Sequence, residues 1–274
     1  MDKQLRNYIF IAVGLLLVVA IIYLLNFASY PISKDTDNWG QFGAYIGGVA
    51  GVFLTLLTII LLIKTLDSQN KNATINQFES SFFELLRLHK EITDRIIGEV
   101  HIKVEKSGID EQDTHKGLRF FEKLSEKIKR HYDDNPDTIL NKISNDPSYE
   151  KLLESKQLMQ QEIDAYYNEL YRGKESELGH YFRSLYHLVK FVNDSSIENK
   201  KRYLDLIQAY LTDAELHCTF YNGIAIYGRE RFKPLLDSYS FLENIKPKGD
   251  IFERQFEEFY PQTFINYKNK PRPG

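Results

Sequence analysis

The chain has 274 residues and a formal net charge of −3, so it lacks the strong basic field of a nucleic-acid-binding protein. Cys218 is its only cysteine, which excludes an intrachain disulfide framework and a multi-cysteine zinc site within one chain. Residues 1–66 are strongly apolar, whereas charges of both signs alternate through residues 67–274, as on a solvated helical surface.

An apolar run over residues 8–27 predicts a first transmembrane helix. The run is longer than the core of a signal peptide, which is about 7–15 residues, and no small-residue cleavage site follows it before the next apolar run. A signal peptide is the alternative interpretation, because Lys3 and Arg6 precede the run.

A second apolar run, residues 42–63, contains no charged side chain. It is long enough to cross a hydrocarbon core of about 30 Å, so we predict a second transmembrane helix. Asp37 or Asn38 precedes it and is placed to cap its free N–H groups. Trp39 lies where an interfacial aromatic anchor is expected.

The charges around this predicted hairpin indicate its orientation. Lys3, Arg6, Lys64 and Lys71 flank the two spans, whereas the loop between the spans has one base, Lys34, against two acids. The positive-inside rule therefore predicts both termini in the cytoplasm and the short loop outside.

A glycine face distinguishes the first half of the second span. Gly43, Gly47 and Gly51 recur every four residues, with Gly48 beside them. In lipid, such small residues let two helices approach closely. The face could pack against the first span of the same hairpin, or against a second copy of the chain, giving a homo-oligomer. Neither span has a charged residue in its core, which argues against an ion-coupled transporter.

The remaining chain reads as a helical cytoplasmic domain over residues 67–260 and a polar tail over residues 261–274. Apolar residues recur at three- and four-residue steps and no strand alternation appears, so the predicted fold is all-α with a two-helix transmembrane hairpin. The second span either continues as one long helix or breaks near residues 70–72. We expect a loop over residues 98–117, with a short helix within it as the alternative, and a cap at Asp213. The expected helices of the domain cover residues 64–97, 118–131, 149–171, 179–193, 197–210, 211–227 and 229–242.

Three polar residues of this domain, His180, Arg183 and His187, would line one helix face. Glu79 and His89 lie on another predicted helix that could face it and complete a polar functional cluster. Hydrogen bonding in the core or at an interface is the alternative, and the spacing does not match the i, i+4 histidine pair of a zinc helix.

No catalytic motif is evident elsewhere. His217 and Cys218 are adjacent on a predicted helix and point about 100° apart, so they cannot act on each other as a dyad, and a buried structural cysteine is expected. Phosphate-loop, dinucleotide-binding and nucleophile-elbow motifs are absent from the sequence. We therefore expect no enzymatic activity, no metal and no cofactor.

Several segments nevertheless resemble a known family. The run NWGQFGAYIGG at residues 38–48 opens the second span, and further matches lie at residues 77–86 with His89, at residues 180–188 and at residues 220–222. In this order, coupled to two spans, they resemble phage abortive-infection proteins of the AbiC-like family, which is similar to transmembrane effectors found with some retrons. Residues 98–149 carry no feature of that family and read as a variable insertion.

The resemblance implies a two-span protein of the bacterial inner membrane that acts in phage defence, damaging or depolarising the cell's own membrane when infection is sensed. In a retron, a partner reverse transcriptase with its noncoding RNA–DNA would hold such an effector inactive, and the chain itself would not bind nucleic acid directly. A membrane-anchored binding or scaffold module without pore activity is the alternative function.

Overall fold

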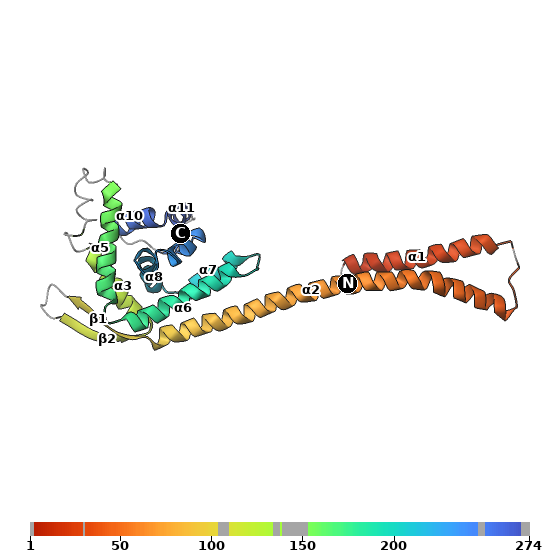
Figure 1. Ribbon diagram of the computed structural model, residues 1–274, viewed down its shortest axis with the longest axis horizontal. Helices are drawn as coiled ribbons and strands as arrows, with labels where there is room; N and C mark the ends of the chain where they lie inside the picture. The colour runs from red at the N-terminus through yellow and green to blue at the C-terminus, as the bar shows by residue number, and fades with distance from the viewer. Residues whose placement is uncertain are drawn as a thin grey trace, which may run out of the picture. The chain divides into compact units, whose positions relative to one another are not determined.

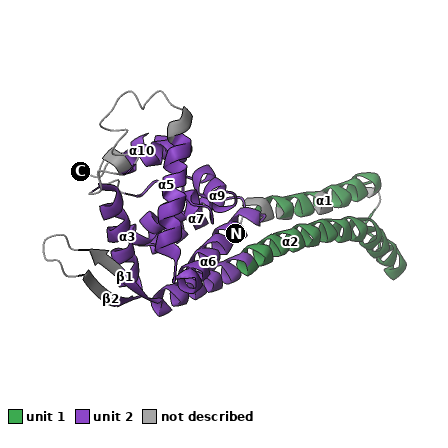
Figure 2. Cartoon of the chain, turned by 60° about the vertical axis from the view of Figure 1, so that its left-hand side comes forward, with its two compact units in different colours: residues 1–77 green, residues 78–274 purple. Residues whose placement is uncertain are grey.

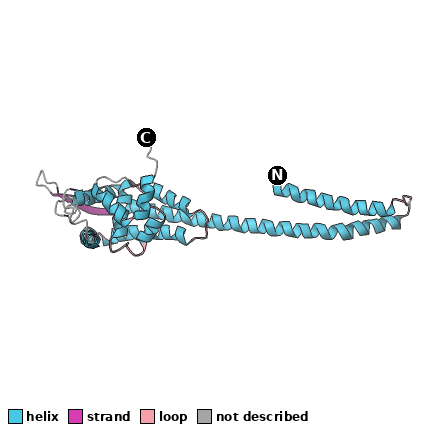
Figure 3. Cartoon of the chain, turned by 90° about the horizontal axis from the view of Figure 1, so that it is seen from above, coloured by secondary structure: helices cyan, strands magenta, loops and turns pink. Residues whose placement is uncertain are grey.

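The computed structural model describes residues 3–29, 31–103, 110–133, 138, 153–245 and 250–269. The chain divides into two compact units, residues 1–77 and residues 78–274 (Figure 2). Helices predominate in both units (Figure 3), so the predicted all-α class is confirmed.

The first unit is a hairpin of two helices, α1 (Lys3–Phe27) and the first part of α2 (Thr36–Arg95) (Figure 1). Both helices are long and apolar enough to span a membrane, the candidate span of α1 being Arg6–Asn26. Only 7% and 6% of their most apolar stretches are buried within the chain. This low burial distinguishes them from the core helices of a soluble domain.

Aromatic and apolar contacts hold α1 and α2 together. The Tyr23 ring lies 4.6 Å from that of Phe42 and 5.6 Å from that of Tyr45, between ring centroids. At the end of the hairpin opposite its loop, the Lys64 ammonium donates to the Tyr8 hydroxyl. The buried and half-buried positions of α2 between these contacts are Phe42, Ile46, Val49, Ala50, Gly51, Leu54, Leu57 and Leu61.

The N-cap of α2 is Asp35, and not Asp37 or Asn38 as expected. The helix begins at Thr36, and the Asp35 carboxylate accepts from the backbone N–H of Asp37 at 3.1 Å. Because Asp37 and Asn38 are already inside the first turn, neither can cap it. The Asn38 amide instead donates to the Ser33 hydroxyl at 2.7 Å. The exposed Trp39 donates from its indole N–H to the Ser33 carbonyl at 3.0 Å, which fixes the ring beside the loop.

The alternative of a break near residues 70–72 is wrong, because α2 continues without interruption to Arg95. Its last residues, from Phe78 on, belong to the second unit. The other helices of that unit are α3 (Leu118–Asp133), α5 (Leu153–Tyr171), α6 (Glu175–Asp194), α7 (Lys200–Tyr210), α8 (Asp213–Ile224), α9 (Phe232–Ser238), α10 (Asp250–Phe259) and α11 (Pro261–Asn269).

The core of the second unit is rich in aromatic side chains. Helix α6, the most apolar predicted helix of the domain, buries eight residues along its length, and α8 buries nine. Helix α8 packs against α3, α5 and α9, and α6 packs against α7 and α9. The largest fully buried aromatic residues are Phe82, Phe120, Phe121, Tyr132, Tyr181, Phe220, Phe241, Phe256 and Tyr260.

The expected loop over residues 98–117 is wrong where the structure describes it. Strands β1 (Ile97–Lys103) and β2 (Asp110–Lys116) pair antiparallel there, with Ile97 opposite Lys116. The second strand, DEQDTHK, is polar and has Thr114 as its single β-branched residue, so tertiary packing decides its conformation. A Cβ on Gly98 would lie 2.4 Å from the Phe120 ring, so this close approach to α3 requires glycine.

Residues 261–269 of the expected polar tail form the helix α11. Thr263 is fully buried, and its backbone N–H and hydroxyl both donate to the Asp237 carboxylate, at 3.0 and 2.9 Å. Phe264 and Tyr267 pack against the Phe256 ring of α10 at 5.7 Å. This aromatic contact anchors α11 despite its polar composition. Residues 270–274 lie outside the described residues, as do residues 104–109, 134–137 and 139–149 of the variable insertion.

Candidate functional site

Among the described residues, the glycine face of α2 makes no contact with α1. Gly43, Gly47 and Gly48 are exposed and Gly51 is half-buried. A Cβ built on any of the four would meet no atom within 4 Å, apart from the neighbouring backbone of their own helix. This observation argues against the interpretation in which the face packs the first span of its own hairpin. Larger apolar residues such as Ile46 and Leu57 take that role, and the glycine face stays open within the chain.

The five residues of the predicted polar cluster do not come together. His180, Arg183 and His187 are exposed on α6. Glu79 accepts instead from the Tyr203 hydroxyl of α7 at 2.7 Å. His89 is 3% exposed, in the contact between α2 and α6. The two helices do face each other, but through other faces than the cluster would need.

His89 is the one member of that set in a distinctive environment. Its Nδ1 lies 3.1 Å from the Ser184 hydroxyl, and its ring lies 4.8 Å from that of Tyr181. Burial lowers the pKa of His89 to about 4, because the charged imidazolium would lose its hydration. At neutral pH the ring is therefore uncharged, which suits a helix–helix contact better than acid–base work.

The cysteine next to His217 has the properties of a core residue. Cys218 is 1% exposed, and its Sγ lies 3.9 Å from the Phe121 carbonyl oxygen. Burial raises the pKa of the thiol far above its ordinary value, so the thiolate form is suppressed. His217 points elsewhere, with Nδ1 2.9 Å from the Ser125 hydroxyl of α3.

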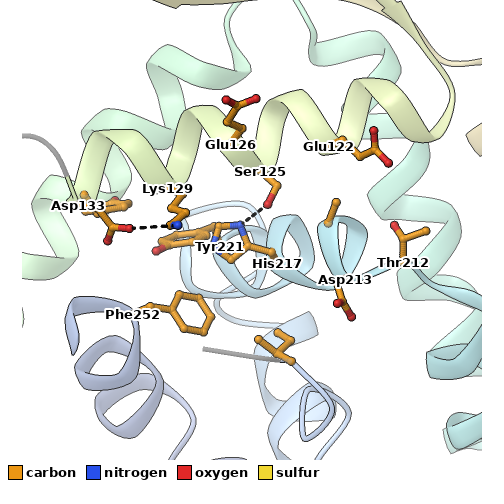
Figure 4. Close-up of a pocket in the computed structure, with 13 residues that line it drawn as sticks. Glu122, Ser125, Glu126, Lys129, Asp133, Thr212, Asp213, His217, Tyr221 and Phe252 are labelled. Atoms are coloured by element: carbon orange, nitrogen blue, oxygen red, sulfur yellow. Dashed lines mark hydrogen bonds and ion pairs between the residues drawn. The ribbon is translucent and has the colours of Figure 1, made fainter. Parts of the chain in front are cut away.

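The contact between His217 and Ser125 lies in a cavity of about 620 Å³ in the second unit (Figure 4). Helix α3 forms one wall, the first turns of α8 form another, and Phe252 of α10 lies across from them. The lining residues are Glu122, Ser125, Glu126, Lys129, Tyr132, Asp133, Thr212, Asp213, Ala214, His217, Tyr221, Ile245 and Phe252.

The lining carries more acidic than basic side chains. It holds four carboxylates and one lysine, and Lys129 lies 3.9 Å from Asp133. Glu126 is paired with Lys123 and Arg130, at 3.0 and 2.6 Å. No set of three or more His, Cys, Asp or Glu side chains in the described part of the chain could hold a metal ion.

A capping box at the mouth of the cavity fixes the start of α8. Thr212, and not the expected Asp213, is the cap. Its hydroxyl accepts from the Glu215 N–H at 3.2 Å, while the Glu215 carboxylate accepts from the Thr212 N–H at 2.8 Å. Glu215 also accepts from the buried Tyr181 hydroxyl of α6 at 3.1 Å. The sequence signal for this box, T-x-x-E, was available, but the cavity itself depends on how α3 and α10 pack on α8.

Residues 173–249 match the family model described as "Putative phage abortive infection protein". The match covers α6 to α9, and with them the α8 wall of the cavity and the motifs at residues 180–188 and 220–222. The predicted family resemblance is thus confirmed over this segment. No curated protein and no solved structure matches the chain.

Proposed function

We propose that this chain, whose residues 173–249 belong to the phage abortive-infection family, is a defence effector that acts on the bacterial inner membrane. The family match supports the role in phage defence. The observation that supports action on the membrane is the pairing of that segment with two helices long and apolar enough to span a bilayer. No enzymatic step is part of the proposal.

Several copies would act together. Two spans from one chain cannot enclose a path across the bilayer, so a breach requires a homo-oligomer. The glycine face of α2 is open within the chain, and glycine in lipid permits close backbone contact between helices. With both termini in the cytoplasm, as the flanking lysines favour, every copy would present this face in the same orientation.

The second unit would hold the effector inactive until infection. It would sense the infection itself or be restrained by a partner, which in a retron is a reverse transcriptase with its noncoding RNA–DNA. A reverse transcriptase gene beside this one would favour the retron arrangement. Co-purification of that enzyme with the full chain would test restraint by a partner directly. Failure to co-purify would contradict such restraint and favour an effector that senses infection by itself.

The membrane action is tested by membrane-potential dyes in cells with induced expression. The wild-type chain should depolarise the cells. Gly47→Leu and Gly51→Leu should abolish depolarisation without lowering the amount of protein in the membrane, because a leucine side chain would separate the two backbones. The same substitution on the other span, Gly14→Leu, is the matched control and should retain activity. Intact potential in dying wild-type cells would overturn the proposal.

Replacing the hairpin separates the proposal from the alternative function. An unrelated two-span anchor should abolish depolarisation if the native spans breach the bilayer. A binding or scaffold module would tolerate the exchange, because it needs only a tether. His180→Ala addresses an enzymatic alternative built on the exposed α6 face, and we expect it to leave toxicity unchanged.

A further inference from the structure

The open face of α2 extends beyond the part that would lie in lipid. Lys64 is the first charged residue after the apolar run, which covers about 33 Å at 1.5 Å per residue. From residue 62 to residue 77 every position of α2 is exposed within the chain. Apart from the contact of Lys64 with Tyr8, no described residue of its own unit packs against this stretch of helix.

One line of residues runs along the whole of this open face. Starting at Ala44, positions at alternating four- and three-residue steps share one side of a helix, the heptad pattern of a helix-to-helix contact. Each position of this α2 seam is small or uncharged. The seam consists of Ala44, Gly48, Gly51, Thr55, Thr58, Leu62, Thr65, Gln69, Asn72 and Asn76.

The seam lies apart from the side of α2 that contacts α1. At 100° per residue, the mean direction of the seam lies about 120–140° around the helix axis from the half-buried Ile46 and Leu57. Nine of the ten seam residues are exposed, and Gly51 is half-buried. A second helix can therefore lie along the seam without displacing α1.

The charges outside the membrane keep away from the seam. Lys64 contacts Tyr8 of α1, on the α1 side of the helix. Asp67 and Lys71 form an i, i+4 ion pair with each other at 3.5 Å. In the same stretch the seam carries only Thr65, two asparagines and a glutamine.

The occupant that fits such a seam is a second copy of the same helix. Copies inserted with the same topology present α2 in parallel, so around a symmetry axis each residue meets its own counterpart. Like charges would repel there, whereas an amide carries both donors and an acceptor and can pair with an identical amide. The side-chain amides of Gln69, Asn72 and Asn76 make no hydrogen bond within the described part of the chain.

The composition of the stretch also calls for a packed partner. Residues 67–77 are rich in Asn, Ser, Asp and Thr, which are poor helix formers in isolation. An unpacked helix of this length is marginal in water, because packing rather than propensity stabilises most helices. Contact with another copy supplies the packing that the chain itself does not.

We propose that copies of the chain associate in parallel along the α2 seam, with Gln69, Asn72 and Asn76 pairing like with like outside the membrane and setting the register of the contact through Gly48 and Gly51 within it. The proposal rests on the membrane hairpin of the proposed function. It does not depend on depolarisation, since a seam contact could also form in a chain that only tethers.

Cysteine cross-linking of the full chain in isolated membranes tests the seam. The only native cysteine, Cys218, is buried, so any cross-link between copies comes from the cysteine introduced on α2. A disulfide requires Cα atoms within about 7 Å, so only positions facing their counterparts can form one readily. Asn72→Cys and Asn76→Cys should cross-link several-fold faster than the off-seam controls Asn70→Cys and Lys71→Cys. Equal rates at the four positions, or no cross-linking at any of them, would overturn the seam.

A charge placed on the seam gives a second test with a matched control. Asn72→Lys should sharply reduce cross-linking through Asn76→Cys, because identical ammonium groups would face each other. Asn70→Lys adds the same charge two residues away and should leave it unchanged. An unchanged rate in both would contradict the proposal. Cross-linking with seam periodicity but without depolarisation would refute only the proposed function. Depolarisation without that periodicity would refute only the seam.

Discussion

Removing the buried imidazole of His89 should change how the stability of the second unit depends on pH. The ring is 3% exposed between α2 and α6, and its Nε2 has no hydrogen-bond partner among the described residues. Burial depresses its pKa to about 4, whereas an unfolded chain returns it to about 6.5. Between these values the unfolded chain binds the extra proton and the folded chain does not, so acid favours unfolding.

The magnitude follows from linkage. The stability contributed by neutral His89 is fully present above about pH 6.5. It is lost as the pH falls towards 4, because protonation of His89 then stabilises the unfolded chain and not the folded one. A difference of about 2.5 pKa units corresponds to about 3 kcal/mol of unfolding free energy lost across that window. Protonation of carboxylates also lowers the unfolding free energy in this pH window, but it does so equally in wild type and variant.

The measurement is urea unfolding of the full chain in detergent, followed by tyrosine near-ultraviolet circular dichroism at several pH values between 4 and 8. His89→Gln has no titrating group at this position and should lose about 3 kcal/mol less than wild type over the window. His180→Gln, on the exposed face of α6, is the matched control and should follow wild type. Parallel curves for wild type and His89→Gln would refute the reasoning.

Three further predictions concern the core of the second unit. Gly223→Ala should lower the free energy of unfolding by about 1–3 kcal/mol, because the new Cβ would lie 2.1 Å from the Tyr260 hydroxyl oxygen. Urea denaturation measures this change, and unchanged stability would contradict the packing. Glu215→Ala should cost about 2–4 kcal/mol, since it removes a capping box and a carboxylate partner of the Tyr181 hydroxyl. Glu215→Gln should recover part of that loss, and equal losses would argue against the box. Cys218 should resist maleimide labelling until the unit unfolds, and rapid labelling of the folded chain would contradict its burial.

The periodic parts of this fold could be predicted because local pattern and tertiary environment agree. The apolar runs before and after the loop at Pro31 became α1 and the first part of α2, and the aromatic helix around Tyr181 became the buried α6. The polar strand β2 could not be predicted, because its conformation comes from pairing with β1 and packing on α3 rather than from its own residues.

The candidate sites show a similar division. The spacing of Gly43, Gly47 and Gly51 correctly placed them on one face, but which neighbour that face meets depends on how α1 packs. For His180 and His187 the helical face was right and its surroundings were not. Helical periodicity gives the side of a helix, and it does not say whether that side is covered. The cavity beside His217 requires three helices separated in sequence, which no local motif encodes.

The central claim is that the chain acts on the membrane when phage infects the cell. The most direct measurement is single-cell membrane potential during a timed infection, in cells carrying the wild-type chain or Gly51→Leu. We predict that wild-type cells depolarise before phage release and yield few phage, while Gly51→Leu cells keep their potential until lysis. Protection from phage with an unchanged potential in wild-type cells would contradict the account.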